Sequence, residues 1–287
     1  MYLLICVHRL VVISHPFEKL LTFPNAKINI GLRITEKRSD GFHNLQSCFY
    51  PVGWSDMLEV VPSNAFGFSS SGLAIPGAVD TNLCVRAYNL LSADFDLPPV
   101  QLHLHKVVPI GAGLGGGSAD AAFALTLLND RFDLDIDVAS LENYARQLGS
   151  DCAFFVKNQP MYCVEKGDVF ESIAVDLRGY YLLLVYPNLA ISTAEAYAAI
   201  QPVRPETSLR NHLQAPIDTW RTTVFNDFEN SLFPLYPVLD QIKQQLYESG
   251  AVYASMSGSG STVYGIFNAP INRPNQFRNY SVWQGKL

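Results

Sequence analysis

Residues 108–122, VPIGAGLGGGSADAA, place five glycines within seven positions. The alternating, strand-like run VQLHLHKVV precedes them, and an alanine-rich run follows in which Ala122, Leu125 and Leu128 share one helical face. Glycines let backbone N–H groups approach an anion closely, and a helix start adds unpaired N–H groups and a positive dipole end. The stretch therefore predicts a phosphate-binding loop between a strand and a helix.

Two familiar glycine loops do not fit this stretch. A Walker loop ends in Gly-Lys-Ser/Thr, whereas Gly117-Ser118 is followed by Ala119. The spacing from Gly111 to Gly116 fits G-x-G-x-x-G, but a dinucleotide fingerprint follows the first strand of its domain and precedes an acid on the next strand. Here several strand-like runs come first, and DLDID at 133–137 lies in a polar connection. A nicotinamide-dependent Rossmann protein is therefore disfavoured.

Composition indicates a globular protein. The 287 residues are 48% hydrophobic and 16% charged, enough apolar surface for one large domain or two packed lobes. The formal net charge is −6, and a negatively charged protein does not attract nucleic acid or an anionic membrane, so neither is expected as a partner. The five scattered cysteines form no Cys-x-x-Cys pair, which argues against a disulfide framework or a structural zinc site and favours the cytoplasm.

The first 20 residues predict an additional N-terminal extension. His8-Arg9 interrupts their apolar run, and they lack the charged start and small-residue cleavage site of an export signal. No run of about 18 apolar residues occurs, so no transmembrane helix is expected.

The rest of the chain predicts a mixture of strands and helices. Residues 23–108 show short strand-like runs, with turns predicted at Ser39–Gly41 and Ser69–Gly72 and a helix within 81–95. A second helix fits 138–148, a strand fits 180–187, and helices fit the stretch after Ser192 and 237–250, the latter closed by Gly250. Residues 251–267 indicate strand, turn and strand, while prolines predict a surface loop at 201–216.

Several stretches together resemble one family of small-molecule kinases. PIGAGLGGGSADAA is similar to the ATP loop of the galactokinase, homoserine kinase, mevalonate kinase and phosphomevalonate kinase superfamily. FPNAKINIGLRITEKRSDGFHNLQSCFYPV, LGSDCAFFV, VYPNLAISTAEAY, FNDFENSLF and MSGSGSTVYGIF resemble the 4-diphosphocytidyl-2-C-methyl-D-erythritol kinase family, in that family's order. The resemblance runs from about residue 23 to residue 267.

This resemblance implies a fold and a reaction. The implied fold is α+β and two-lobed, with a ribosomal-protein-S5-like N-terminal lobe and a ferredoxin-like C-terminal lobe. We expect an extension at 1–20, an ATP-loop domain at 21–168 and a C-terminal domain at 169–287. The implied reaction transfers the γ-phosphoryl group of ATP, with Mg²⁺, to the 2-hydroxyl of a cytidine-diphosphate-linked methylerythritol in the non-mevalonate isoprenoid route. A monomer or weak homodimer is expected.

The resemblance also assigns roles to individual residues. Asp151 takes the position of the catalytic base and Lys27 that of its charged partner, while Asn29 shares the strand face of Lys27. Phe42, where the family usually has tyrosine, and His43 take the positions that recognise the cytosine ring. Without the resemblance, Asp151 would be interpreted as a helix cap, Lys27 as a solvated strand lysine and His43 as a surface histidine.

Further residues are expected around the ligands. Pro187 and Thr193 match a stretch that closes over the substrate, and residues 226–229, NDFE, are expected to support the fold. Ser118 is expected to act as a helix cap or as a phosphate or Mg²⁺ contact. His103 and His105 have no evident third ligand, so they are interpreted as solvent-facing. The ATP loop and a second, phosphate-proximal loop comprise Pro109, Ile110, Gly111, Ala112, Gly113, Leu114, Gly115, Gly116, Gly117, Ser118 and Ala119, and Gly258, Ser259, Gly260 and Ser261.

Two other functions remain open on the same fold. A sibling kinase would act on homoserine, mevalonate or a sugar, but DGFHN at 40–44 favours a substrate with a planar base. A catalytically silent ligand sensor would need neither Lys27 nor Asp151, so that pair favours an enzyme.

Overall fold

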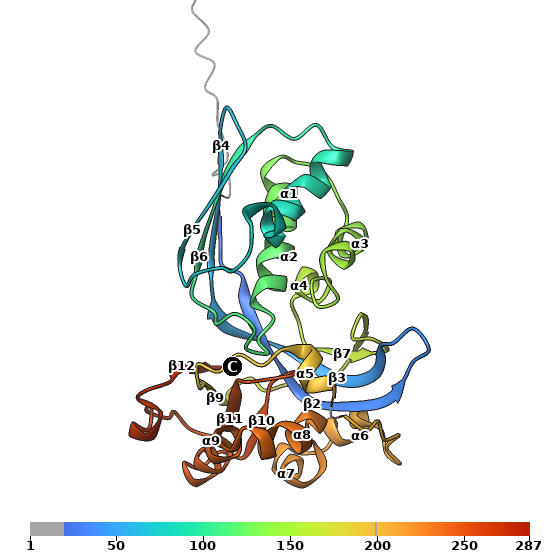
Figure 1. Ribbon diagram of the computed structural model, residues 1–287, viewed down its shortest axis with the longest axis vertical. Coiled ribbons are helices and arrows are strands. Elements are labelled where there is room, and N and C mark those ends of the chain that lie inside the picture. The colour runs from blue at the N-terminus through green and yellow to red at the C-terminus, as the bar shows by residue number, and fades with distance from the viewer. Residues whose placement is uncertain (1–19, 199) are drawn as a thin grey trace, which may run out of the picture.

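The computed structural model describes residues 20–198 and 200–287, which form two lobes built on three four-stranded sheets. The predicted extension lies outside the described residues except for Leu20. Figure 1 shows the first lobe above and the second below, with the long strand β2 (Asn25–Lys37) running between them. Among the described residues, no helix is both long and apolar enough to cross a membrane.

The first lobe packs helices on one face of a sheet. Its strand order is β1-β4-β6-β5, with β5 parallel to β6 and the other pairs antiparallel. The helices lie together on one side of this sheet (Figure 1), where their apolar faces form a core with the inward residues of the strands. The elements are β1 (Leu21–Thr22), β4 (Met57–Pro62), β5 (Gly67–Gly72), β6 (Val100–Lys106), α1 (Leu83–Asp94), α2 (Gly116–Arg131), α3 (Val138–Leu148) and α4 (Phe154–Lys157).

A long hairpin joins the lobes. β2 pairs with β3 (His43–Ser55), and the sheet continues through β7 (Met161–Val164) to β8 (Val169–Ser172). The predicted turn at Ser39–Gly41 connects β2 and β3. Residues Ala26 to Leu32 are all buried: Ala26, Ile28 and Ile30 pack into a core with residues of the second lobe, and the alternate residues Lys27 and Asn29 are buried polar side chains. The β7–β8 pairing crosses residue 168, so this sheet continues past the predicted domain boundary.

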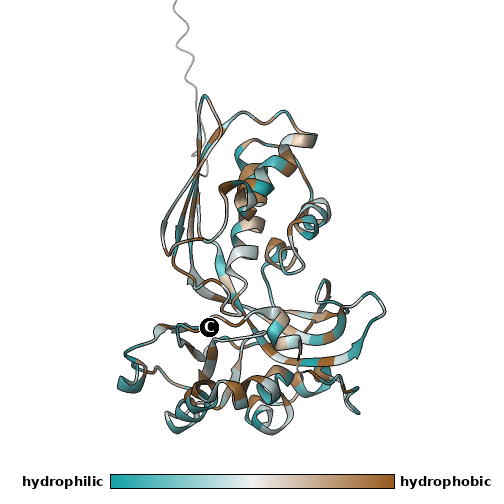
Figure 2. Ribbon diagram, in the orientation of Figure 1, coloured by the Kyte–Doolittle hydropathy of each residue, from teal (hydrophilic) through white to brown (hydrophobic). Residues whose placement is uncertain are grey.

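The second lobe covers a fully antiparallel sheet with helices. The strand order is β10-β11-β9-β12, and Figure 2 shows both hydrophobic and hydrophilic residues on the helices beneath it, as expected of helices with one buried face. α9 begins at Pro237, which suits a first helical position, and ends before Gly250. The elements are β9 (Tyr181–Tyr186), β10 (Tyr253–Met256), β11 (Val263–Phe267), β12 (Ser281–Lys286), α5 (Thr193–Ala198), α6 (Leu209–Leu213), α7 (Trp220–Thr223), α8 (Asp227–Leu235) and α9 (Pro237–Glu248).

Two local predictions were wrong. The predicted turn at Ser69–Gly72 is part of strand β5, because the backbone pairs in parallel with β6 and the Ser69 and Ser71 hydroxyls bond the rings of His103 and His105. The predicted surface loop at 201–216 contains the short helix α6, because Leu209 and Leu213 recur four residues apart and are buried in the second lobe.

Candidate active site

The glycine stretch connects β6 to α2 as predicted. Gly115 is the N-cap residue of α2, in the left-handed region at a φ of 69°, and has no side chain with which to cap the helix. The first-turn N–H groups of α2 therefore remain available to an anion at the positive end of the helix dipole. Ser118 lies inside the first turn, so the structure does not make it the helix cap.

A buried ion network holds both ends of this loop. Lys106 Nζ lies 2.5 Å from Asp56 Oδ2 and 2.6 Å from Asp120 Oδ2, and all three side chains are almost completely buried. Asp56 Oδ1 accepts from the N–H groups of Val107 and Val108, at 2.5 and 2.8 Å. The network therefore ties the exit of β6 to the first turns of α2.

Asp120 remains incompletely satisfied within this network. No donor among the described residues reaches its Oδ1 atom, which is buried. Burial raises the pKa of Asp120 to about 7, against the opposing attraction of Lys106. The carboxylate thus keeps one oxygen that no donor in the described part of the chain reaches, beside the glycine loop.

Two cavities lie on either side of the glycine loop. Cavity A has a volume of about 560 Å³ and cavity B about 390 Å³. Gly111, Gly113 and Gly115 line both, so the glycine loop borders two adjoining ligand-sized spaces. The site residues predicted from the sequence divide between them: cavity A contains Lys27, Asn29, Phe42, His43, Asp151, Thr193, Gly258 and Ser259, and cavity B contains Pro109, Ile110, Ala112, Gly116, Gly117 and Ser118.

The proposed catalytic pair meets in cavity A. Lys27 Nζ lies 3.4 Å from Asp151 Oδ2 and donates to Asn29 Oδ1 at 2.5 Å. Asn29 donates in turn to Ser47 Oγ at 2.9 Å, which fixes the orientation of its amide. The side chain of Asp151 is 29% exposed, so it remains accessible to a ligand while keeping its cationic neighbour.

The simpler interpretations of these two residues do not hold. Lys27 is 4% exposed, its ammonium lies 4.5 Å from the centre of the Phe49 ring, and its backbone N–H bonds Leu114 O of the glycine loop at 2.9 Å. It is therefore not a solvated strand lysine. Asp151 does not cap α4, since the N-cap residue of that helix is Ala153.

Cys152, beside Asp151, is buried, and burial raises the pKa of its thiol to about 11.

Aromatic side chains line the other end of cavity A. Phe42 is 59% exposed, and Lys166 Nζ lies 5.3 Å from its ring centre. The His43 ring stacks on Tyr197 at 4.9 Å between centroids, and partial burial lowers its pKa. These rings offer flat apolar surface together with a ring nitrogen, which suits a planar heterocycle.

The second small-residue loop packs directly on the glycine loop. A Cβ atom on Gly113 would lie 2.0 Å from the carbonyl oxygen of Ser257, so the two backbones are in contact there. Ser257 Oγ donates to Gly113 O at 2.7 Å and accepts from the backbone N–H of Asn29 at 3.2 Å. The glycine loop, strand β2 and the second loop therefore meet at one point beside Lys27.

Some predicted site residues do not line either cavity. Leu114 and Ala119 are buried in the core, and Pro187 is half-buried just after β9. Ser261 is buried and its hydroxyl bonds the carbonyl oxygen of Leu189, while Gly260 bonds Ser257 O within the loop. These residues shape the walls around the cavities.

Sequence reasoning missed part of each cavity. Tyr197 was not assigned to the site, although its aromatic side chain at the end of the matched stretch VYPNLAISTAEAY was a usable signal. Part of the wall of cavity B comes from the segment before α1 and from the first residue of that helix, where the sequence carried no motif; the residues are Ile75, Pro76, Thr81, Asn82 and Leu83.

Comparison with known proteins places the chain among kinases. The GHMP kinases N terminal domain matches residues 82–159, and the GHMP kinases C terminal domain matches residues 214–278. A 4-diphosphocytidyl-2-C-methyl-D-erythritol kinase of Bacteroides fragilis is 51% identical over 253 residues, covering 87% of this chain and 92% of the relative. Its counterpart in Parabacteroides distasonis is 46% identical over 270 residues, covering 93% and 100%.

Solved structures of kinases also match this chain over most of its length. A crystal structure of 4-(cytidine 5'-diphospho)-2C-methyl-D-erythritol kinase matches with a TM-score of 0.77 and 28% identity, covering 93% of this chain and 98% of that chain. The mevalonate kinase of Methanococcus jannaschii matches with a TM-score of 0.67 at 12% identity, over 94% and 98%, and so shares the fold. The predicted two-lobed α+β kinase fold is confirmed.

Proposed function

The chain belongs to the 4-diphosphocytidyl-2-C-methyl-D-erythritol kinase family, within the GHMP kinases, and on that premise we propose how its two cavities perform the family's reaction. The reaction is the ATP-dependent phosphorylation of the 2-hydroxyl group of 4-diphosphocytidyl-2-C-methyl-D-erythritol, a step toward isoprenoid precursors. Cavity B takes ATP, with its phosphates along the glycine loop, and cavity A takes the cytidine substrate. The single observation that carries this division is that Gly111, Gly113 and Gly115 line both cavities.

Asp151 acts as the general base in this proposal. As the substrate 2-oxygen forms its bond to the γ-phosphorus, its proton passes to the Asp151 carboxylate and the bond from phosphorus to the β-bridging oxygen breaks, releasing ADP. Lys27 keeps the carboxylate oriented and offsets negative charge on the transferring phosphoryl group, which its 3.4 Å separation from Asp151 and its burial support.

The glycine loop and its helix supply the donors for the phosphates. The first-turn N–H groups of α2 have no side-chain cap, and Ser118 lines cavity B beside them. Oxygen ligands for Mg²⁺ are also present there, since Asp120 Oδ1, which has no partner among residues 20–198 and 200–287, and the Ser118 hydroxyl are hard donors of the kind that this ion prefers. Mg²⁺ would neutralise charge on the phosphates when bound with ATP.

The aromatic end of cavity A binds the cytosine ring. Phe42, His43 and Tyr197 present ring faces and a ring nitrogen, and Phe42 is sufficiently exposed to stack on a ligand. This feature supports the cytidine substrate over homoserine, mevalonate or a sugar, because none of those three carries a base.

An ADP-release assay tests the proposed substrate. We expect turnover with 4-diphosphocytidyl-2-C-methyl-D-erythritol and background rates with mevalonate, homoserine and galactose. Activity confined to one of the last three would refute the assignment.

Asp151→Asn tests the proposed base. The variant keeps the shape of the side chain but cannot accept the proton, so we expect kcat to fall by about 10² to 10⁴ while the affinity for ATP is unchanged. Turnover close to that of the wild type would show that Asp151 is not the base.

A further inference from the structure

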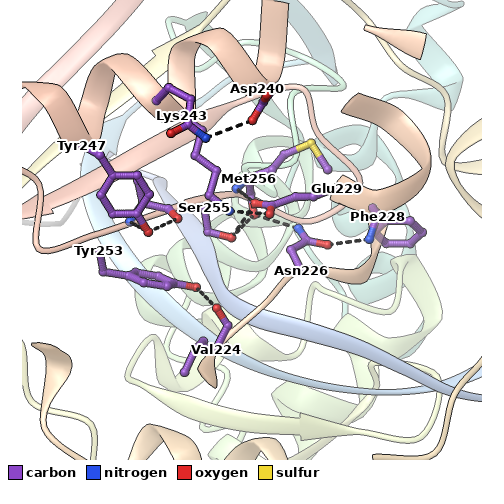
Figure 3. Close-up of polar contacts among 12 residues, drawn as sticks. Val224, Asn226, Phe228, Glu229, Asp240, Lys243, Tyr247, Tyr253, Ser255 and Met256 are labelled. Carbon is purple, nitrogen blue, oxygen red and sulfur yellow. Dashed lines mark hydrogen bonds and ion pairs between the residues drawn. The ribbon is translucent and has the colours of Figure 1, made fainter. Parts of the chain in front are cut away.

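Residues 226–229, NDFE, had no chemical role in the sequence, yet Asn226 and Glu229 belong to a buried polar network (Figure 3), and Phe228 between them lines cavity A. Asn226 is 1% exposed, and its Nδ2 donates to the carbonyl oxygens of Met256 and Gly258, both at 2.8 Å. Its Oδ1 accepts from the backbone N–H of Phe228 at 3.0 Å, where it caps α8. If the Asn226 side-chain amide were flipped, its Oδ1 atom would face the carbonyl oxygens of Met256 and Gly258, and no hydrogen bond could form. The orientation of the amide is therefore fixed.

Glu229 holds the C-terminal end of strand β10, which Asn226 also bonds. Its Oε1 accepts from the Met256 N–H at 2.8 Å and from Ser255 Oγ at 3.0 Å, and its Oε2 accepts from Lys243 at 2.5 Å. Met256, the last residue of β10, is therefore held at its N–H by Glu229 and at its carbonyl by Asn226 (Figure 3). The second loop therefore follows a residue whose backbone N–H and carbonyl are both held by hydrogen bonds.

The bond to Gly258 determines which way the next peptide group faces. In a trans peptide the C=O and the following N–H point in opposite directions. Because the Gly258 carbonyl points at Asn226, the N–H of Ser259 points away from Asn226, and both Gly258 and Ser259 line cavity A. Within the described part of the chain, bonds from the N–H groups of Ser257, Gly260 and Thr262 are present, but none from Gly258 or Ser259.

The network also connects this loop to the strand that carries Lys27. Asp227 accepts from the Ile34 N–H at 2.8 Å and pairs with Arg33 at 2.9 Å. The N–H of Leu32 bonds Phe225 O at 2.9 Å. The second loop and β2 are thus both fixed to the start of α8.

We propose that Asn226 is a positioning residue for phosphoryl transfer: by holding the Gly258 carbonyl, it aims the Ser259 N–H at the phosphoryl group in cavity A. This inference rests on the proposed function, because it needs a phosphate at the meeting point of the two loops. A donor fixed in advance toward developing negative charge stabilises the transition state without reorganisation during the reaction. Asn226 itself does not touch the substrate.

Asn226→Asp tests the proposal with almost no change in side-chain volume. A carboxylate oxygen would replace the Nδ2 donor opposite two carbonyl oxygens, so the Gly258–Ser259 peptide should rotate. Loss of one positioned donor costs about 10² to 10³ in kcat, and we expect a misaimed donor to cost about tenfold to hundredfold, with KM for both substrates changed less than about threefold.

Ser255→Ala is the matched control. Ser255 is buried in the same network, and its hydroxyl bonds Glu229 at 3.0 Å and the Met256 carbonyl at 3.4 Å, whereas the Gly258 carbonyl is bonded by Asn226. We expect both variants to lower Tm by a few degrees and only Asn226→Asp to lower kcat. A wild-type kcat in folded Asn226→Asp, or an equal kcat loss in Ser255→Ala, would overturn the proposal.

A measurement on the wild-type protein needs no variant. The amide signal of Ser259 in a ¹H–¹⁵N NMR spectrum is expected to shift when a non-hydrolysable ATP analogue and the cytidine substrate are both present. An unmoved amide in the ligand-bound protein overturns the inference. Failure of the proposed function would be visible separately, as absence of wild-type turnover with the cytidine substrate.

Discussion

Gly113→Ala is the sharpest test of the contact between the two loops. Gly113 adopts a φ of 77°, a region that costs an alanine about 1 to 2 kcal/mol. The added Cβ atom would also lie 2.0 Å from Ser257 O, a backbone atom. Cβ contacts below 3.0 Å essentially do not occur, so the two loops must separate by about 1 Å.

That displacement gives the expected magnitudes. Overpacking adds about 1 to 3 kcal/mol to the backbone strain, so the free energy of unfolding should fall by about 2 to 5 kcal/mol. A misplacement of about 1 Å at a reacting centre costs about 10²-fold in rate, so kcat should fall by about a hundredfold. Thermal unfolding and the ADP-release assay measure the two effects.

Gly179→Ala is the control variant, because it introduces backbone strain without a new steric contact. Gly179 has a φ of 98°, but a Cβ atom there would meet nothing within 4 Å. We expect a loss of about 1 to 2 kcal/mol in stability with kcat unchanged. If Gly113→Ala behaved like Gly179→Ala in both measurements, the contact between the loops would have no role in catalysis.

Three further predictions follow from the site. In Lys27→Met, an attraction to Asp151 of about 1 to 5 kcal/mol at 3.4 Å is lost, so kcat should fall about tenfold or more in the ADP-release assay; an unchanged kcat would contradict the role of Lys27. Phe42→Ala should raise KM for the cytidine substrate by about tenfold, because stacking on a base contributes about 1 to 3 kcal/mol, whereas equal changes in both KM values would exclude specific stacking. Asp120 has a folded pKa of about 7, above its unfolded value of 3.8, so its contribution to stability is full below about pH 4 and lost as pH rises through 7. The Tm difference between Asp120→Asn and wild type should therefore change over that range, and a constant difference would show that Asp120 does not titrate there.

The parts of the site carried by local sequence patterns could be predicted. The glycine density and the helix after it predicted the phosphate loop, and the two-residue period of a strand placed Lys27 and Asn29 on one face, where their side chains meet at 2.5 Å. The hairpin turn at Ser39–Gly41 was predicted for the same reason, since turn residues act locally.

The remaining features depend on residues that lie far apart in the chain. Asp56, Lys106 and Asp120 each read as an ordinary charged residue, and only the packing of β4, β6 and α2 brings them together and buries them. Strand β5 was missed because serine and glycine usually indicate turns, whereas its parallel pairing with β6 decides its structure. The role of Asn226 likewise depends on two carbonyl groups that lie 30 and 32 residues away in sequence.

The three glycines that line both cavities have a consequence for inhibition. A compound that fills cavity A and extends along Gly113 toward cavity B would contact residues of both sites. Drug-resistant variants commonly block an inhibitor by enlarging a side chain. At Gly113 that route is closed, because the same enlargement would drive the chain into Ser257 and disable the enzyme along with the inhibitor.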